Sequence, residues 1–161
     1  FAAGEAARAA GAKVCLDLAS YTVVEASKAH LDEFIGKYVD ILLANEDEAS
    51  AFTGVTGEVE QLKMLSDRAA TAVLKVGKRG SFISVNGDVT EVTAIGAGDA
   101  VDTTGAGDLW ASGFLYGLVN DLPIETCGLL ASACGFEVVQ VMGASIPPDG
   151  WTRIKQILEQ S

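Results

Sequence analysis

The residues with the clearest chemical meaning lie at positions 102–110, where the chain reads DTTGAGDLW. Gly105, Ala106 and Gly107 have little or no side chain, so a bound group can approach their backbone N–H groups closely. Asp108 follows directly, and its carboxylate can accept a proton from an attacking hydroxyl. Amides beside a proton acceptor indicate phosphoryl transfer, which depends on positioning and on stabilisation of phosphate charge.

An apolar run, LWASGFLYGL at 109–118, begins directly after Asp108. Leu109, Gly113, Leu115 and Leu118 recur along this run. The spacing predicts a packed helix whose N-terminus carries the glycine-rich turn. Backbone N–H groups at a helix N-terminus lack intrahelical acceptors, and the helix dipole adds roughly half a positive charge there. The sequence therefore predicts an anion site at this helix end.

Residues 102–110 resemble the C-terminal signature of the PfkB carbohydrate kinase family, the ribokinase-like sugar and nucleoside kinases, usually written D-T-x-G-A-G-D-x-F. The chain departs from that pattern only at its last position, where Trp110 replaces phenylalanine. The resemblance implies that Asp108 is the catalytic base that deprotonates the acceptor hydroxyl. It also implies that residues 105–107 form an anion hole for the transferring phosphoryl group. The alternative interpretation is a glycine-rich helix cap with an ordinary first-turn aspartate.

A second Gly-Ala-Gly-Asp sequence occurs just upstream, at 96–99. The chain continues after Asp99 as Ala-Val-Asp with no helical run, so amides in this copy would not converge at a helix end. We therefore expect residues 96–99 to form a loop and Asp99 to be a solvated turn residue. This assigns the catalytic role to Asp108 alone.

The sequence NEDE at 45–48 stands at the end of an expected strand, where open α/β sheets bind ligands. It resembles the N-x-x-E motif of the same family. That resemblance implies that Asn45 contacts the nucleotide phosphates and that Glu48 orients water around Mg²⁺. Magnesium prefers oxygen ligands and keeps several waters, so an outer carboxylate is chemically reasonable. The alternative is a helix N-cap followed by acidic residues that the helix dipole favours.

Residues 75–81, KVGKRGS, read as a strand end that turns through two glycines into another strand. They resemble the family's nucleotide-binding turn, commonly T-x-G-x-x-G, with Lys75 where threonine is frequent. Gly77 and Gly80 allow close backbone approach, and Lys78 has the charge to reach a phosphate. We expect the backbone to form a wall of the ATP site, and the sequence leaves open whether a side chain contacts ATP. A tight turn with solvated basic residues is the alternative.

Asp102 and Thr104 precede the expected anion hole. In potassium-activated members of the family the corresponding residues help to bind a monovalent cation, so the resemblance implies a K⁺ site here. A capping or loop-bracing role is the alternative, and the sequence does not decide between the two.

Composition and charge limit the function classes. The chain has 161 residues, 49% hydrophobic and 20% charged, which is typical of one globular domain. Its net charge of −11, without a basic cluster, argues against nucleic acid or an anionic membrane as a partner. The three cysteines lack metal-ligand spacing, so we expect free thiols and a cytoplasmic protein. Bound Mg²⁺ would offset the acidic field at a phosphate site.

Strand and helix patterns alternate along the chain and predict an α/β fold. Helices are expected at 2–10, 22–37, 46–52, 58–70, 105–119, 123–140 and 149–160, and strands at 13–18, 39–45, 72–77, 81–86 and 88–95. Asn86-Gly87 predicts an antiparallel hairpin between the last two strands. Trp151, Ile154, Ile157 and Leu158 are expected to form the buried face of the last helix. With the resemblance, the fold class is a ribokinase-like three-layer α/β/α sandwich with a mostly parallel sheet.

Family members are considerably longer, and their N-terminal half supplies the acceptor pocket and a β-sheet lid. We therefore expect residues 1–161 to be the C-terminal part of a single kinase domain, the nucleotide-binding and catalytic half, inactive by itself. A homodimer through the absent lid is a further expectation from the resemblance. The acceptor is a sugar or a nucleoside, and the stretch LDLASYTVVE at 16–25 resembles the adenosine-kinase-like branch more closely.

Two functions follow from these observations. The first is ATP-dependent phosphoryl transfer to a sugar or nucleoside hydroxyl. The second is a nucleotide-binding regulatory module, derived from such a kinase, that no longer catalyses. The presence of Asp108 favours the first, because a binding module needs the glycines and amides but not the base.

Overall fold

A computed structural model gives the fold of the chain and describes residues 1–96 and 98–159. Ala97, within the upstream Gly-Ala-Gly-Asp sequence, and Gln160, at the end of the last predicted helix, lie outside the described residues. The chain divides into two compact units. The first contains Phe1–Val76 and Phe82–Thr90, and the second contains Gly77–Ser81 and the chain from Glu91 onward.

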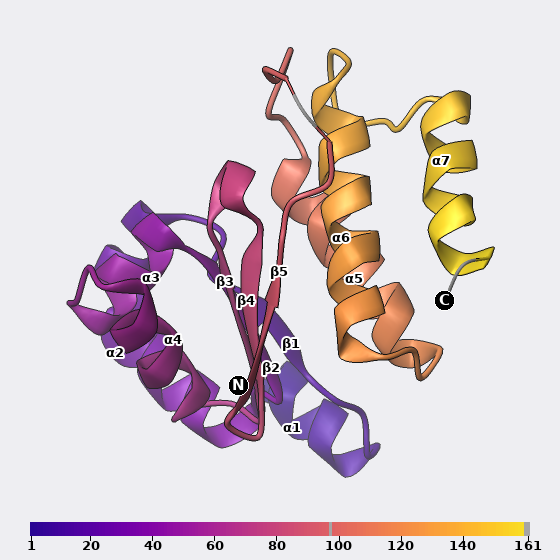
Figure 1. Cartoon of the computed structure of the whole chain (residues 1–161). Helices are drawn as coiled ribbons and strands as arrows, with labels where there is room; N and C mark the ends of the chain where they lie inside the picture. Colours follow the sequence, from indigo (N-terminus) through magenta and orange to yellow (C-terminus); the bar gives the residue numbers. More distant parts are fainter. Residues whose placement is uncertain (97, 160–161) are drawn as a thin grey trace. The chain divides into compact units, whose positions relative to one another are not determined.

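The helices and strands follow the predicted order (Figure 1). They are α1 (Ala2–Ala9), β1 (Cys15–Asp17), α2 (Tyr21–Tyr38), β2 (Ile41–Asn45), α3 (Glu46–Thr53), α4 (Glu58–Ser66), β3 (Thr71–Lys75), the 3₁₀ helix η1 (Gly77–Arg79), β4 (Ser81–Val85), β5 (Asp88–Val92), α5 (Ala106–Val119), α6 (Ile124–Val139) and α7 (Pro148–Glu159). Two differences stand out. The helix predicted to end at residue 70 ends at Ser66, and η1 was not predicted.

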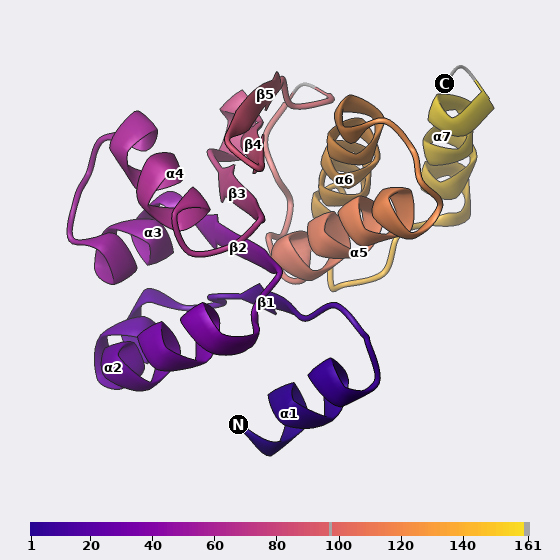
Figure 2. The same ribbon diagram turned by 90° about the horizontal axis from the view of Figure 1, so that it is seen from below.

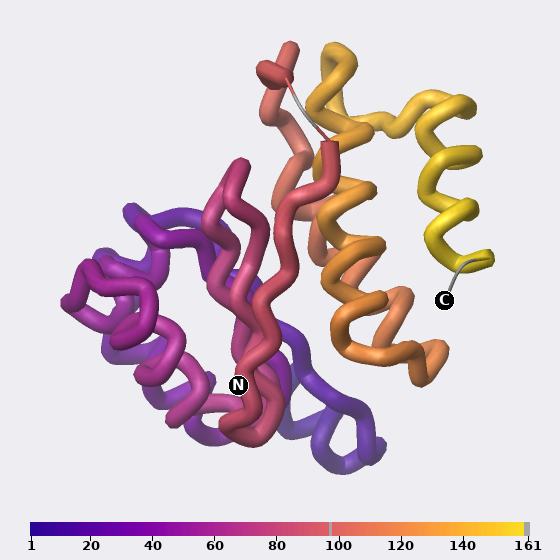
Figure 3. Tube along the Cα trace, in the orientation of Figure 1, coloured from indigo at the N-terminus to yellow at the C-terminus, as the bar shows by residue number. Residues whose placement is uncertain are grey.

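The strands form one sheet in the order β1-β2-β3-β4-β5. The first three run parallel, with Leu16 opposite Leu42 and Asn45 opposite Lys75. Asn86 and Gly87 join β4 to β5 with φ values of 51° and 95°, the left-handed backbone of a tight hairpin turn. A two-residue connection joins only antiparallel neighbours, so the predicted hairpin is confirmed (Figure 3).

Three helices, α2, α3 and α4, cover one face of the sheet in the first unit (Figures 1 and 2). Alternate strand residues such as Leu42 and Leu74 point toward them and are fully buried. Val24 of α2 and Leu65 of α4 belong to the same apolar core. β2 and β3 are buried along most of their length, and their polar residues Asn45 and Lys75 come at the carboxyl ends.

In the second unit, α5 packs closely against α6 through glycines. A Cβ on Gly113 would lie 2.7 Å from the carbonyl oxygen of Leu130, and one on Gly117 would lie 2.7 Å from Sγ of Cys127. Glycine is unfavourable inside a helix, so the two glycines mark a close helix contact. Trp110 is buried and stacks on Phe114, with ring centroids 5.3 Å apart.

The predicted buried face of α7 is partly wrong, whereas no buried face was predicted for α5. The buried residues of α5 are Trp110, Gly113, Phe114 and Gly117, whereas Leu115 and Leu118 are only half-buried. On α7, Ile154 is buried as predicted, but Trp151 is 43% exposed. The spacing of apolar residues shows that a helix is amphipathic. It does not show whether a large apolar side chain at the border of the apolar face is buried or exposed.

The three cysteines are free thiols, as predicted. Cys127 and Cys134 are buried, and Cys15 is half-buried. No helix within residues 1–96 and 98–159 combines the length and the apolar character that crossing a membrane would need.

Candidate active site

The glycine-rich turn forms the N-terminus of α5, as predicted. Gly105 is the N-cap residue and has φ of 77°, and Asp108 lies exposed in the first helical turn. The Ala106 N–H donates to the carbonyl oxygen of Thr103 at 3.2 Å, so this amide is already engaged. Among the described residues, the amides of Gly105, Gly107 and Asp108 find no backbone acceptor. These three amides are the donors that the helix end offers to an anion.

Asp102 braces the loop that leads to this helix end. Its Oδ1 accepts hydrogen bonds from the N–H of Thr104 at 2.9 Å and from the Thr104 hydroxyl at 2.7 Å. Its Oδ2 accepts from the N–H of Gly143, between α6 and α7, at 2.8 Å. The hydrogen bonds from Gly143 and Thr104 lower the pKa of Asp102 below its ordinary value. The loop-bracing alternative therefore has direct geometric support.

Asn45 and Glu48 form a reciprocal capping box at the start of α3. The Glu48 N–H donates to Oδ1 of Asn45 at 2.9 Å, while Oε2 and Oε1 of Glu48 accept from the backbone N–H and the side-chain amide of Asn45, each at 2.8 Å. Glu48 is only 4% exposed. Burial raises its pKa, and the hydrogen bond from the Asn45 backbone opposes that shift. Both carboxylate oxygens of Glu48 therefore already accept hydrogen bonds within the helix cap.

Lys75 ends β3, and its ammonium group binds a residue that sequence reasoning missed. Lys75 Nζ donates to Oδ2 of Asp17, the last residue of β1, at 2.7 Å. The two side chains are 14% and 27% exposed. Asp17 lies in the strand predicted at 13–18, and no site role was predicted for it. The missed signal was that two parallel strands, each ending in a charged residue, bring those charges to the same edge of the sheet.

The glycine turn after β3 belongs to the second unit and contains η1. Gly77 and Gly80 have φ of 57° and 113°, so both require glycine-like backbone freedom. A Cβ on Gly80 would collide with the carbonyl oxygen of Val92 and the N–H nitrogen of Ala94. At this turn the glycines serve the chain's own close packing as well as any access for a nucleotide.

Lys78, in the same turn, pairs with Asp99 at 2.7 Å, and both side chains are largely exposed. The hydrogen bond from Lys78 lowers the pKa of Asp99. Exposed pairs of this kind contribute little to stability, so Lys78 can leave Asp99 readily. Asp99 is a solvated loop residue, as predicted, with a partner that was not predicted.

The predicted site residues lie in both units. In the first unit, Asn45 and Lys75 end strands β2 and β3, and Glu48 lies in the first turn of α3. The second unit contains Gly77, Lys78, Gly80, Asp102, Thr104 and residues 105–108. Within the units the structure brings together Asn45 with Glu48, and Asp102 with Thr104.

The described part of the chain contains no cluster of three His, Cys, Asp or Glu side chains that could hold a metal ion.

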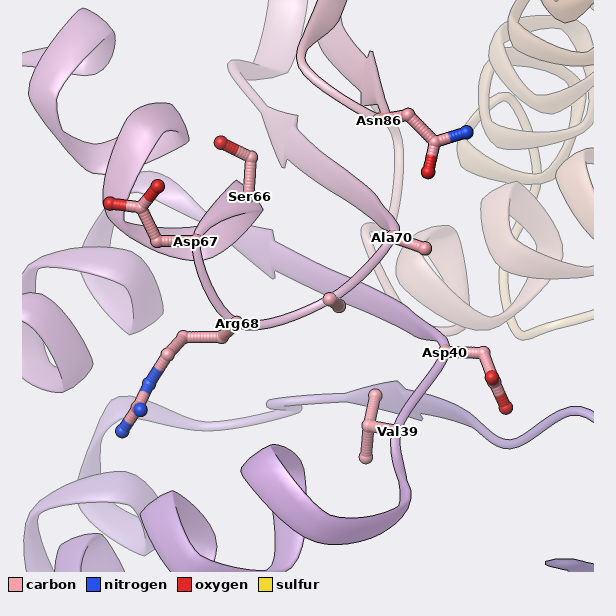
Figure 4. Close-up of a pocket in the computed structure, with 8 residues that line it drawn as sticks. Val39, Asp40, Ser66, Asp67, Arg68, Ala70 and Asn86 are labelled. Atoms are coloured by element: carbon pink, nitrogen blue, oxygen red, sulfur yellow. The ribbon is translucent and has the colours of Figure 1, made fainter.

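One surface hollow lies at the opposite edge of the sheet (Figure 4). It is lined by Val39, Asp40, Ser66, Asp67, Arg68, Ala69, Ala70 and Asn86. Asp40 and Ala70 directly precede β2 and β3, so the hollow is at the amino ends of these strands. Figure 4 shows Arg68 extending away from Asp40 and Asn86, and its guanidinium binds Asp32. Parallel sheets bind ligands at the other edge, and the hollow is not the candidate site.

Comparison with known proteins identifies the class. Residues 1–150 match the family described as pfkB family carbohydrate kinase, and the chain belongs to that family. A nucleoside kinase from Methanocaldococcus jannaschii is 32% identical over 94 residues, which are 58% of this chain and 31% of that protein.

Two solved structures show the same fold. Adenosine kinase from Sinorhizobium meliloti superposes with a TM-score of 0.90 at 28% identity, over 96% of this chain and 47% of that one. Arabidopsis thaliana ribokinase, complexed with ribose and ATP, superposes with a TM-score of 0.78 at 30% identity, over 98% of this chain and 51% of that one. The predicted ribokinase-like α/β fold is therefore confirmed. The chain spans about half the length of these solved relatives.

Proposed function

We propose that the chain is the nucleotide-binding and catalytic part of a kinase that transfers the γ-phosphoryl group of ATP to a hydroxyl of a sugar or nucleoside. The observation that carries this proposal is the position of Asp108 on α5. Its carboxylate is exposed in the first helical turn, directly after three small residues whose amides include free donors. This reaction requires at least a proton acceptor beside an anion site.

In the proposed reaction Asp108 takes the proton of the acceptor hydroxyl. The resulting oxygen forms a bond to the γ-phosphorus, the bond between that phosphorus and the β–γ bridging oxygen breaks, and ADP leaves. The amides of Gly105, Gly107 and Asp108 donate hydrogen bonds to the phosphoryl oxygens as charge redistributes. Ala106 contributes by its small side chain, since its own N–H is engaged with Thr103.

The nucleotide is proposed to lie along the Gly77–Gly80 turn, with backbone groups rather than side chains as its wall. Asn45 is proposed to contact a phosphate, and Glu48 is proposed to act on Mg²⁺ through water. When bound with ATP, Mg²⁺ neutralises phosphate charge, which matters in a chain of net charge −11. The relatives support ATP as the donor, because ribokinase was solved with it.

The acceptor class rests on the relatives. Their names include an adenosine kinase, a nucleoside kinase and a ribokinase. We propose a sugar or a nucleoside as the acceptor, because a probable sugar kinase from Rhizobium etli superposes with the same TM-score of 0.90, at the same 28% identity, as the adenosine kinase.

The test compares two aspartates in matched sequences. In the complete natural protein that contains this chain, Asp108→Asn should lower kcat by about 10² to 10⁴ while MgATP affinity changes little. Asp99→Asn, in the upstream copy, should leave kcat nearly unchanged. A large loss at Asp99, or normal turnover at Asp108, would assign the base elsewhere. If the unchanged protein binds MgATP but phosphorylates none of a panel of sugars and nucleosides, the alternative of a regulatory nucleotide-binding module applies.

A further inference from the structure

The Asp17–Lys75 ion pair has no assigned role in the proposed reaction. The charged atoms lie 2.7 Å apart, and both side chains are substantially shielded from water. Asp17 is held from a second side as well, because its Oδ1 accepts the N–H of Ala19 at 3.1 Å. A pair with one fixed partner and little exposure is far less mobile than an exposed pair.

The Asp17–Lys75 ion pair also spans strand β2. Lys75 lies opposite Asn45 in the sheet, and Asp17 lies opposite Leu43, so β2 runs between the two charged residues. Lys75 therefore extends across the end of β2 to reach β1. The bridge ties three neighbouring strand ends together at the edge where a parallel sheet binds ligands.

Asp17 and Lys75 offset each other's charge, and Glu48 lies beside them. Glu48 lies close enough for both members of the pair to act on it: burial raises its pKa, Lys75 lowers it and Asp17 raises it. Both Glu48 oxygens already accept hydrogen bonds from Asn45. If Lys75 turned toward a phosphate, Asp17 would remain as a shielded, unpaired carboxylate next to a polyanion, which is costly.

We propose that Asp17 and Lys75 act as one neutral unit at the nucleotide-binding edge of the sheet, in which Lys75 is a positioning residue and not a phosphate ligand. The proposal rests on the proposed function, since it assumes that nucleotide phosphates bind at this edge. The proposed role of Lys75 is charge compensation: nucleotide binding requires Lys75 because the Asp17 carboxylate is present. A lysine that binds phosphate directly would be needed whether or not Asp17 is there.

A double-mutant cycle separates these two roles. The variants are Lys75→Met, Asp17→Asn and the two combined, made in the complete natural protein, and the measured quantity is the Kd of MgATP by calorimetry. Lys75→Met should raise Kd on the order of tenfold, equal to about 1.4 kcal/mol, because it exposes the phosphates to an uncompensated carboxylate. The double variant should return Kd to within about threefold of the unchanged protein, a difference of about 0.6 kcal/mol.

Controls follow from the same structure. Lys75→Arg keeps the charge and should keep the affinity, whereas Lys63→Met removes an exposed lysine from α4 and should change nothing. Urea unfolding of every variant shows whether a loss of affinity accompanies a loss of fold.

Two results would overturn the proposal. A double variant as weak as Lys75→Met alone would make Lys75 a direct ligand, and an unchanged Kd in Lys75→Met with reduced stability would make the pair purely structural. Failure of the proposed function is seen separately, as binding of MgATP without phosphorylation of any acceptor. Because the double-mutant cycle measures only the Kd of MgATP, it still tests the role of Lys75 when no acceptor is phosphorylated.

Discussion

Gly105 and Ala144 are in such close contact that a Cβ added to Gly105 would lie 2.6 Å from the Cβ of Ala144. Gly105 also has φ of 77°, a left-handed backbone that residues with side chains adopt with strain. The fold therefore requires glycine at position 105 for two reasons, the left-handed backbone and the close contact with Ala144. Neither reason involves a phosphate. The loop between α6 and α7, which contains Ala144, therefore packs directly against the start of α5.

Gly105→Ala should consequently damage stability and function together. The left-handed backbone alone costs roughly 1–3 kcal/mol, and the contact with Ala144 adds to it. Urea unfolding of the chain should show this loss, and MgATP affinity should fall because the helix end shifts.

Gly36→Ala is the matched control. Gly36 lies within α2 and needs no left-handed backbone. Apart from its chain neighbours and the backbone of its own helix, no atom of the described residues lies within 4 Å of an added Cβ. Alanine there should stabilise the chain by about 0.5–1 kcal/mol. Equal effects of the two substitutions would contradict the role given to Gly105.

Glu48→Gln tests the helix cap and the proposed magnesium role at once. Glutamine presents one acceptor and one donor to Asn45, whose backbone N–H and side-chain amide both donate to Glu48. One of the two hydrogen bonds must be lost, at a cost of roughly 1 kcal/mol of unfolding free energy. If Glu48 also acts on Mg²⁺, the Mg²⁺ concentration for half-maximal rate should rise more than the KM for the acceptor.

Loss of stability with an unchanged magnesium dependence would leave Glu48 with the capping role only. Thr53→Val on the same helix is a useful comparison, because the Thr53 hydroxyl donates to the carbonyl oxygen of Ala49 and lies away from the strand end. Its effect should be confined to stability.

Asp102 should give the chain a step in stability at acidic pH. Hydrogen bonds from Gly143 and Thr104 lower its pKa in the folded state below the ordinary 3.8, so the folded state binds this proton less readily than the unfolded state. The resulting stabilisation is complete above the unfolded pKa and disappears as pH falls through the folded pKa. Asp102→Asn should remove this step, so the urea midpoint of the variant should change less with pH between about pH 5 and 2.

Potassium provides the second readout for Asp102. If the loop-bracing role is sufficient, the complete natural protein should have the same rate in K⁺ and in tetramethylammonium salts. Strong activation by K⁺, lost in Asp102→Asn and in Thr104→Val, would support the cation site instead.

The sequence predicts those parts of the site that are local along the chain. The Gly-Ala-Gly-Asp turn, the Asn45–Glu48 cap and the Asn86-Gly87 hairpin each depend on residues within a few positions of one another, and each has a known backbone geometry. Element bounds near Ser66 were missed because helix ends depend on packing beyond the segment.

Contacts distant in sequence were not predictable. Asp17 and Lys75 are 58 residues apart, and Asp102 and Gly143 are 41 apart. The first contact requires the register of three strands, and the second requires the path of the loop after α6. A pattern of residue types contains neither, so the sequence suggested ligand roles for Lys75 and Asp102, whose side chains bind other parts of the chain.

Glu137 and Arg153 form another such contact, which holds α7 on α6. Nε and an Nη of Arg153 donate to the two oxygens of Glu137, each at 2.5 Å, and the Glu137 side chain is only 4% exposed. Arg153→Met should lower the urea midpoint of the chain, because it leaves a buried carboxylate unpaired. Lys155→Met, an exposed position on the same helix, should not. Equal midpoints would mean that the apolar contacts around Ile154 hold α7 by themselves.

The 161-residue chain by itself should bind nucleotide weakly and transfer no phosphate. The amides of α5, the Gly77–Gly80 turn and the Asn45 end of β2 are all within it, so each part of the proposed phosphate site is present. The chain nevertheless matches only 47% of the length of the adenosine kinase that it resembles in fold. Holding a hydroxyl against Asp108 and excluding water contribute about 7–11 kcal/mol to such reactions, and no residue described in this chain has been found to hold the acceptor. Calorimetry with MgADP and a phosphorylation assay on ribose, fructose, adenosine and inosine make the test. Rapid phosphorylation of any of the four would mean that the acceptor site lies within these residues.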